Sequence, residues 1–261
     1  MKKCHKEFIN AGANVITTNN YSCVPKCLQI GGDISEDDLI AYIEKSGQLA
    51  VESVDESGKE GIIVAGGLPP LGPTFNSDMV QDDEILERDY ELIASTIEPY
   101  ADIFLCETMS SIREALGACR VADKYEKPIW CSFAIGESEE CLLRSGERMT
   151  DAIEALGEIK NLEAILVNCS STDSALIAMP IMKSAAKPGV KVGAYANNFP
   201  PKKNVLQNPA LPVQCFHDEY RKELSTQNYA RIAQNWLDNG ASIIGGCCGI
   251  FPEHIEELKT I

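Results

Sequence analysis

Three cysteines at the ends of two apolar segments are the residues of this sequence best suited to chemistry. Cys169 follows the apolar run EAILVN, and Cys247 and Cys248 follow ASIIGG near the C-terminus. Thiolates are among the best zinc ligands, and three protein ligands leave the fourth position of a tetrahedral ion open, as in catalytic sites. If the two segments end side by side, the three thiols form a metal site with room for a ligand.

The adjacency of Cys247 and Cys248 requires a special backbone. Neighbouring side chains of a regular strand point to opposite faces, so both thiols reach one ion only where the strand has ended and the chain turns. Gly245, Gly246 and Gly249 surround the pair and permit such a turn. Spacing alone leaves two alternatives open: the pair packs in the core and the third cysteine is unrelated, or a disulfide joins two of the three.

Seven strand-like segments alternate with amphipathic helices and would position these residues. Each is a near-continuous apolar run rich in β-branched residues, which is typical of strands buried on both faces of a parallel sheet. The segments are residues 13–18, 61–68, 101–108, 128–135, 163–171, 190–198 and 241–248. The helices between them are predicted to open at Ser111, at Thr150 with Asp151, at Thr172 or Asp173, at Thr226 and at Pro252.

Polar and reactive residues collect where these segments end, and this distribution decides between two folds. The strand ends carry Thr17–Asn19, Gly66–Gly67, Glu107–Thr108, Asn168–Cys169 and Gly246–Cys248. A doubly wound sheet would carry a glycine-rich phosphate turn, and no G-x-G-x-x-G occurs. Barrel enzymes build their sites from the C-terminal ends of many strands. We therefore expect an α/β fold, a (β/α)8 TIM barrel with about seven recognisable β/α units, in which residues 1–261 form a single domain.

Composition argues against several classes of partner. The formal net charge of −16 would repel nucleic acid. No apolar run approaches the roughly 20 residues that cross a bilayer, and the start MKKCHKEFIN lacks the apolar core of a signal peptide. The eleven cysteines lie mostly in apolar segments. They indicate a reducing, cytoplasmic compartment, and we expect Cys106, Cys119 and Cys131 to be small buried hydrophobic residues.

Five motifs together resemble the zinc-dependent homocysteine S-methyltransferase family. GGCCGIFPEHI is similar to the family's C-terminal Gly-Gly-Cys-Cys-Gly signature, and LVNCSS is similar to its central Asn-Cys motif. AGANVITTNNY, AGGLPPLGP and FLCETMSSIREAL resemble three further family segments. The matches occur in family order over nearly the whole chain, and its length resembles that of single-domain members that use S-methylmethionine or S-adenosylmethionine.

The resemblance implies a metal site and an amino-acid pocket. Cys169, Cys247 and Cys248 would bind Zn²⁺, and the sulfur of homocysteine would take the fourth position. Glu107 matches the family glutamate that holds the substrate's amino group, although a charge at a helix N-terminus is the alternative. The resemblance gives no catalytic residue beyond the metal site.

Further pocket residues follow from the same resemblance. Thr18, Asn19 and Tyr21 would line the substrate pocket, with a packing role equally open for Tyr21. Asn168 is a candidate for contacting substrate or orienting a cysteine, and the alternative is a plain hydrogen bond at a strand end.

The function implied is transfer of a methyl group from a sulfonium donor to homocysteine, giving methionine, as in methionine biosynthesis. Betaine remains an alternative donor, because betaine-using relatives share the zinc motif. Two other interpretations stay open. One is a truncated, catalytically impaired zinc-binding paralogue or isoform, and the other is a zinc-free barrel enzyme whose cysteines are core residues.

The sequence departs from the family at two places. The family opens on a strand with an Asp-Gly-Gly or Asp-Gly-Ala motif, and this sequence has no such segment. We therefore expect an N-terminally truncated barrel that lacks the first strand, with reduced stability and activity. Residues 194–220 are rich in proline and polar residues and predict a long loop that could contact the methyl donor.

Overall fold

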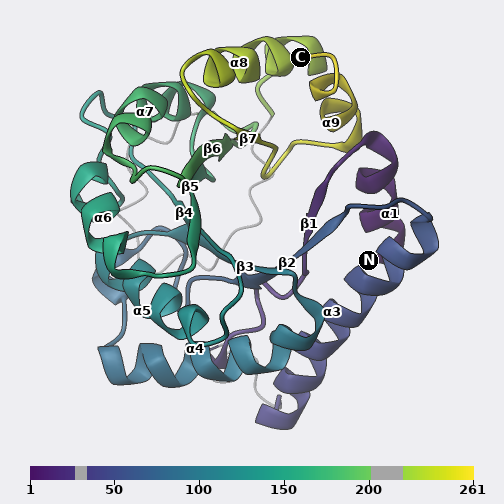
Figure 1. The fold of residues 1–261 in the computed structure, drawn as a ribbon, viewed down its shortest axis with the longest axis vertical. Coiled ribbons are helices and arrows are strands. Elements are labelled where there is room, and N and C mark those ends of the chain that lie inside the picture. The colour runs from purple at the N-terminus through teal and green to yellow at the C-terminus, as the bar shows by residue number, and fades with distance from the viewer. Residues whose placement is uncertain (27–33, 201–219) are drawn as a thin grey trace.

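The strands of the protein form one parallel sheet that curls around a centre, with the helices on its outside (Figure 1). The computed structural model describes residues 1–26, 34–200 and 220–261. The sheet has seven strands in sequential order. They are β1 (Val15–Thr17), β2 (Ile63–Leu68), β3 (Ile103–Met109), β4 (Ile129–Phe133), β5 (Leu162–Asn168), β6 (Lys191–Tyr195) and β7 (Ile243–Ile244). The seven parallel strands predicted from the apolar runs are thus confirmed as a curled half-barrel.

A helix follows each strand, as the alternating pattern predicts. The α-helices are α1 (Lys2–Ala11), α3 (Glu36–Ser57), α4 (Asp83–Ile97), α5 (Ile112–Asp123), α6 (Met149–Ala155), α7 (Thr172–Ala185), α8 (Thr226–Asp238) and α9 (Pro252–Leu258). Short 3₁₀ turns are η1 (Ser77–Met79), η2 (Glu98–Tyr100) and η3 (Leu156–Glu158). Among the described residues, no helix is both long and apolar enough to cross a membrane.

The helix starts largely follow the capping chemistry of the sequence. Ser111 caps α5, as predicted, because its hydroxyl accepts a hydrogen bond from the amide of Glu114. The predicted start of the next helix was wrong by one residue, because α6 begins at Met149 rather than at Thr150. Helix α7 begins at Thr172, one of the two predicted positions, and is capped by Ser171, whose hydroxyl accepts from the amide of Ser174.

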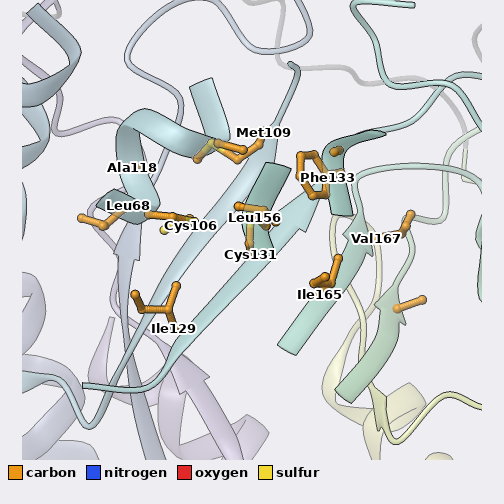
Figure 2. Close-up of a cluster of buried hydrophobic side chains, with 14 of the residues drawn as sticks. Leu68, Cys106, Met109, Ala118, Ile129, Cys131, Phe133, Leu156, Ile165 and Val167 are labelled. Atoms are coloured by element: carbon orange, nitrogen blue, oxygen red, sulfur yellow. The ribbon is translucent and has the colours of Figure 1, made fainter. Parts of the chain in front are cut away.

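The two faces of the sheet carry separate hydrophobic cores. The inner core contains only strand residues, among them Ile103, Leu105 and Trp130. The outer core joins the strands to the helices, and Figure 2 shows Cys106 and Cys131 in it. Because strand side chains alternate, Glu107, two positions beyond Leu105, also lies on the inner side. Cys106, Cys119 and Cys131 are completely buried, which confirms the expectation for these lone thiols.

The edges of the sheet are β1 and β7, and α1 packs against α9 on the outside of this region (Figure 1). Strand β7 pairs with β6 only through Ile243 and Ile244, so the predicted strand 241–248 is much shorter. Beyond Ile244, the amides of Gly245 and Cys247 still donate to the carbonyls of Ala194 and Ala196, both at 3.0 Å, so the chain continues beside β6 without regular strand pairing. Within the predicted loop 194–220, residues 201–219 lie outside the described part of the chain.

Candidate metal centre and substrate pocket

The structure brings together the three thiols that the sequence singled out. Cys169 lies directly after β5, and Cys247 and Cys248 lie after β7. The Sγ atoms of Cys169 and Cys247 are 2.9 Å apart, and those of Cys247 and Cys248 are 3.7 Å apart. All three Sγ atoms lie within 4.8 Å of one another. The carboxyl ends of two strands far apart in sequence therefore form one sulfur cluster.

The backbone around the cluster is specialised at three points. Cys169 has a φ of 47°, in the left-handed region that non-glycine residues seldom adopt, and Gly249 has a φ of 76°. A Cβ atom on Gly246 would lie 2.1 Å from Cγ2 of Ile250, so only glycine fits that turn. The amide of Cys247 donates to the carbonyl of Ala196 at 3.0 Å and fixes the turn beside β6. These features direct the neighbouring thiols to one side.

The cluster is suited to a soft cation. Hydrogen bonds from the thiols of Cys169 and Cys247 lower the pKa of the Cys248 thiol and favour its thiolate form. A tetrahedral zinc ion with Zn–S bonds of about 2.3 Å places its sulfur ligands about 3.8 Å apart. The Cys247–Cys248 separation of 3.7 Å already matches this value, and the 2.9 Å pair needs to open slightly. The donor set thus fits zinc.

Glu107 brings a carboxylate to the same end of the sheet. It lies on the inner side of β3, and its Oε1 is 3.5 Å from the position that a Cβ atom on Gly67 would take. Burial and the negative charge of Cys248 raise the pKa of the Glu107 carboxyl to about 7. A half-buried carboxylate that feels the negative charge of Cys248 is stabilised by a cation, and an ammonium group would serve.

Asn168 ties three strands together beneath the cluster. Its Oδ1 accepts hydrogen bonds from the Ser132 hydroxyl at 2.7 Å and from the Thr108 amide at 3.1 Å. Its Nδ2 donates to Oγ1 of Thr108 at 2.8 Å. Thr108 has a φ of 62° at an irregularity of the β3–β4 pairing. The side chain is completely buried and makes these three hydrogen bonds, and it stabilises strained backbone beside both Glu107 and Cys169.

The segment after β1 supplies polar side chains to this end of the sheet, and the motif alone did not specify which of them are buried. The Thr18 hydroxyl accepts from the Gly67 amide at 2.9 Å and donates to Oδ1 of Asn20 at 2.7 Å. Nδ2 of Asn20 donates to the Gly67 carbonyl at 2.9 Å. Asn19 is exposed, whereas Asn20 is completely buried. The Tyr21 hydroxyl is 3.0 Å from Oγ1 of Thr74, and burial raises its pKa, assisted by the charge of Cys169.

Sequence reasoning missed several polar groups at this end of the sheet. Buried side-chain polar atoms without a hydrogen-bond partner are rare in folded proteins and call for an explanation. Of the six such atoms in the described part of the chain, five belong to loops or strand ends at this end. They are on Gln81, Ser138, Arg144, Tyr195 and Asn198. Strand alternation could have found Tyr195, whose hydroxyl lies beside the Ser132 hydroxyl without a well-formed hydrogen bond to it.

Comparison with known proteins supports the motif resemblance. The model of the family described as homocysteine S-methyltransferase matches residues 1–261. Homocysteine S-methyltransferase 1 of Arabidopsis thaliana is 26% identical over 99% of this chain and 82% of its own length. The corresponding Escherichia coli (strain K12) protein is 23% identical over 100% of this chain and 83% of its own length.

A solved structure shows the same fold. The metallated form of the homocysteine methyltransferase MmuM from Escherichia coli superposes with a TM-score of 0.80 at 21% identity. The superposition covers 99% of this chain and 83% of MmuM. Since the family match spans every residue, the resemblance inferred from the motifs is confirmed. The chain belongs to the homocysteine S-methyltransferase family.

Proposed function

We propose that this chain transfers a methyl group from a sulfonium donor to the sulfur of homocysteine and produces methionine. The observation that carries the proposal is the cluster of three thiols at the same end of the sheet as the half-buried carboxylate of Glu107. Homocysteine carries a thiol and an ammonium group, and these two groups match a soft-metal site and a carboxylate. The family membership supports the same activity.

Cys169, Cys247 and Cys248 would hold the zinc ion. Zinc bound there supplies a thiolate at neutral pH, because it favours loss of the proton from a sulfur ligand. Glu107 binds the ammonium group of the acceptor through a charge-assisted hydrogen bond and thereby orients the molecule. The ammonium also stabilises the ionised form of this carboxyl, whose pKa burial has raised to about 7. A sulfonium donor loses its methyl group as a neutral thioether, so no strong acid is needed.

The remaining side chains of the pocket position these groups. Asn168 holds the backbone at Thr108, next to Glu107. Thr18 and Asn20 hold the end of β1 against β2. Tyr21, fixed by its contact with Thr74, lies where the charges of Cys169 and Glu107 act on it. We further propose that residues 1–261 form one domain and supply seven strands of a (β/α)8 barrel.

A second candidate is a zinc-binding chain without turnover. It is favoured by the sheet itself, because β1 and β7 are edges and the described strands do not close into a ring. An unclosed sheet holds the two sides of a rim site less firmly than a closed barrel does.

Metal analysis combined with donor-specific assays tests both candidates. Purified under reducing conditions, the chain is expected to contain about one zinc ion and to form methionine from homocysteine with S-methylmethionine, S-adenosylmethionine or betaine. Serine in place of Cys169, Cys247 or Cys248 should remove the zinc. Serine in place of Cys4, an exposed thiol on α1, is the control that should keep it.

Each outcome separates the candidates. Bound zinc without turnover with all three donors supports the second candidate. Reduced protein without zinc rejects both and leaves the cysteines as core residues.

A further inference from the structure

Arg144 lies in the connection between β4 and α6, at the same end of the sheet as the thiol cluster. This connection folds back on itself through two antiparallel bridges, Ile135 with Leu143 and Leu142 with Arg148. The carbonyl of Leu142 also accepts from the Gly136 amide at 2.8 Å. The guanidinium is therefore presented from a braced loop rather than from an open one.

The guanidinium of Arg144 lies over an aromatic ring. Its Cζ lies 5.0 Å from the centre of the Phe75 ring, within the range of a cation–π contact. Its Nε is buried and has no hydrogen-bond partner among residues 1–26, 34–200 and 220–261. Within the residues that the structure describes, no carboxylate forms an ion pair with it. Arg221, by contrast, is paired with Asp173 and Glu223.

Glu137 is the acidic residue whose charge acts on Arg144, but its carboxylate is already hydrogen-bonded to other side chains. The Glu137 carboxylate accepts hydrogen bonds from the hydroxyls of Ser171 and Ser174, both at 2.7 Å. Burial lowers the pKa of the Arg144 guanidinium, and the negative charge of Glu137 acts in the opposite direction. Ile135, which is bridged to Leu143, donates its amide to the Ser170 hydroxyl at 2.9 Å, so the loop that carries Arg144 lies beside the residue that follows Cys169.

The platform of Arg144 is built into the pocket. Phe75 has a φ of 69°, a strained value for an aromatic residue, and the preceding Thr74 contacts the Tyr21 hydroxyl at 3.0 Å. Such strain persists where the surrounding structure over-determines it, and it concentrates at ligand sites. The loop after β2 therefore holds Phe75 beneath the guanidinium.

We propose that Arg144 is the carboxylate-binding residue for the amino-acid substrates of this site. The inference rests on the proposed function, which already assigns the thiol to the cysteines and the ammonium to Glu107, and leaves the carboxylate without a partner. A planar guanidinium binds a carboxylate through two parallel hydrogen bonds, and the Nε of Arg144 is one donor that the described residues leave unused. The carboxylate belongs to the acceptor or to the donor, since homocysteine and all three candidate donors carry one.

Three variants separate charge, fork geometry and general electrostatics. R144M keeps much of the side-chain length and removes the charge. R144K keeps the charge and the contact with Phe75 but loses the two-pronged donor. R148M removes an exposed arginine from the same connection and serves as the matched control.

Calorimetric titration of the zinc-loaded protein compares homocysteine with 3-aminopropanethiol, the same molecule without its carboxylate. Steady-state assays add the KM of the donor. If Arg144 binds the acceptor, R144M weakens homocysteine roughly 10- to 100-fold and leaves 3-aminopropanethiol unchanged. If it binds the donor, homocysteine binding is unchanged and the donor KM rises by a similar factor. R144K gives a smaller loss of the same kind, and R148M gives none.

Several results would overturn the inference. The first is that R144M, or R144K if R144M does not fold, leaves both homocysteine affinity and donor KM unchanged. The second is that R148M has the same effect as R144M. Wild-type protein that binds neither thiol rejects the proposed function and this inference with it. Wild-type protein that binds homocysteine while the Arg144 variants bind and turn over normally rejects the inference alone.

Discussion

Replacing Asn168 with alanine should destabilise the protein and loosen the metal centre together. The side chain makes three hydrogen bonds in a completely buried position, two through Oδ1 and one through Nδ2. Alanine leaves the Thr108 amide, the Thr108 hydroxyl and the Ser132 hydroxyl without this partner. All three groups belong to completely buried residues, so water does not reach them freely.

The magnitude follows from the groups left unsatisfied. A buried donor or acceptor without a partner costs about 1–3 kcal/mol. The two hydroxyls can rotate toward other acceptors or share a water molecule in the new space, whereas the Thr108 amide cannot turn. The expected loss in the free energy of unfolding is therefore about 2–4 kcal/mol, less than the sum of three full penalties. Zinc affinity should fall roughly 10- to 100-fold, because Cys169 loses the support of its neighbour.

Urea denaturation of the metal-free protein measures the first quantity, and competition with a chelator measures the second. Ser132→Ala is the control, since it removes one donor and leaves Oδ1 of Asn168 bonded to the Thr108 amide. It should cost only about 0.5–1.5 kcal/mol. An Asn168→Ala protein as stable as wild type, with the same zinc affinity, would show that the network does not hold the site.

Two further substitutions test the carboxylate and the cysteine turn. The pKa of Glu107 is raised from 4.5 to about 7 on folding, so its charge destabilises the metal-free protein above pH 7, and this cost fades as the pH falls toward 4.5. Glu107→Gln should therefore add about 1–3 kcal/mol at pH 8, with the gain shrinking across that window in urea titrations, and raise the KM of homocysteine. Gly246→Ala places a Cβ atom 2.1 Å from Ile250 and should weaken zinc at least about 10-fold by chelator competition. In Gly245→Ala the nearest heavy atom is 3.4 Å away, and zinc affinity should change by less than about 2-fold; equal effects would refute the steric argument.

The fold could be predicted from the sequence because strands buried on both faces of a parallel sheet have nearly continuous apolar sequences. All seven strands lie within the predicted segments or within a residue of them. The exception in length is β7, where the run ASIIGG is apolar to its end but pairs only through Ile243 and Ile244. Hydrophobicity does not reveal where a ladder stops when the terminating residues are glycines.

Only those parts of the site could be predicted that follow from residue type and from the alternation of side chains along a strand. The thiol trio followed from its residue types together with the family motif, and alternation places Glu107 on the inner face. The choice between Asn19 and Asn20 was not readable, because it depends on how the chain turns after β1. The left-handed conformations of Thr108 and Cys169 were also hidden, since threonine and cysteine give no local signal for them. Arg144 was not predicted as a site residue, because only the fold brings its loop to the ring of Phe75.

The placement of Asn168 explains why a single side chain affects two functions. In the proposed reaction, the covalent skeleton of homocysteine fixes the distance between its sulfur and its ammonium group. The protein must therefore hold Cys169, after β5, and Glu107, on β3, at a constant separation across the intervening β4. Asn168 spans that gap by bonding Ser132 on β4 and Thr108 on β3. Loosening it should thus raise the KM of homocysteine even when zinc is saturating, because the two halves of the pocket would no longer keep their spacing.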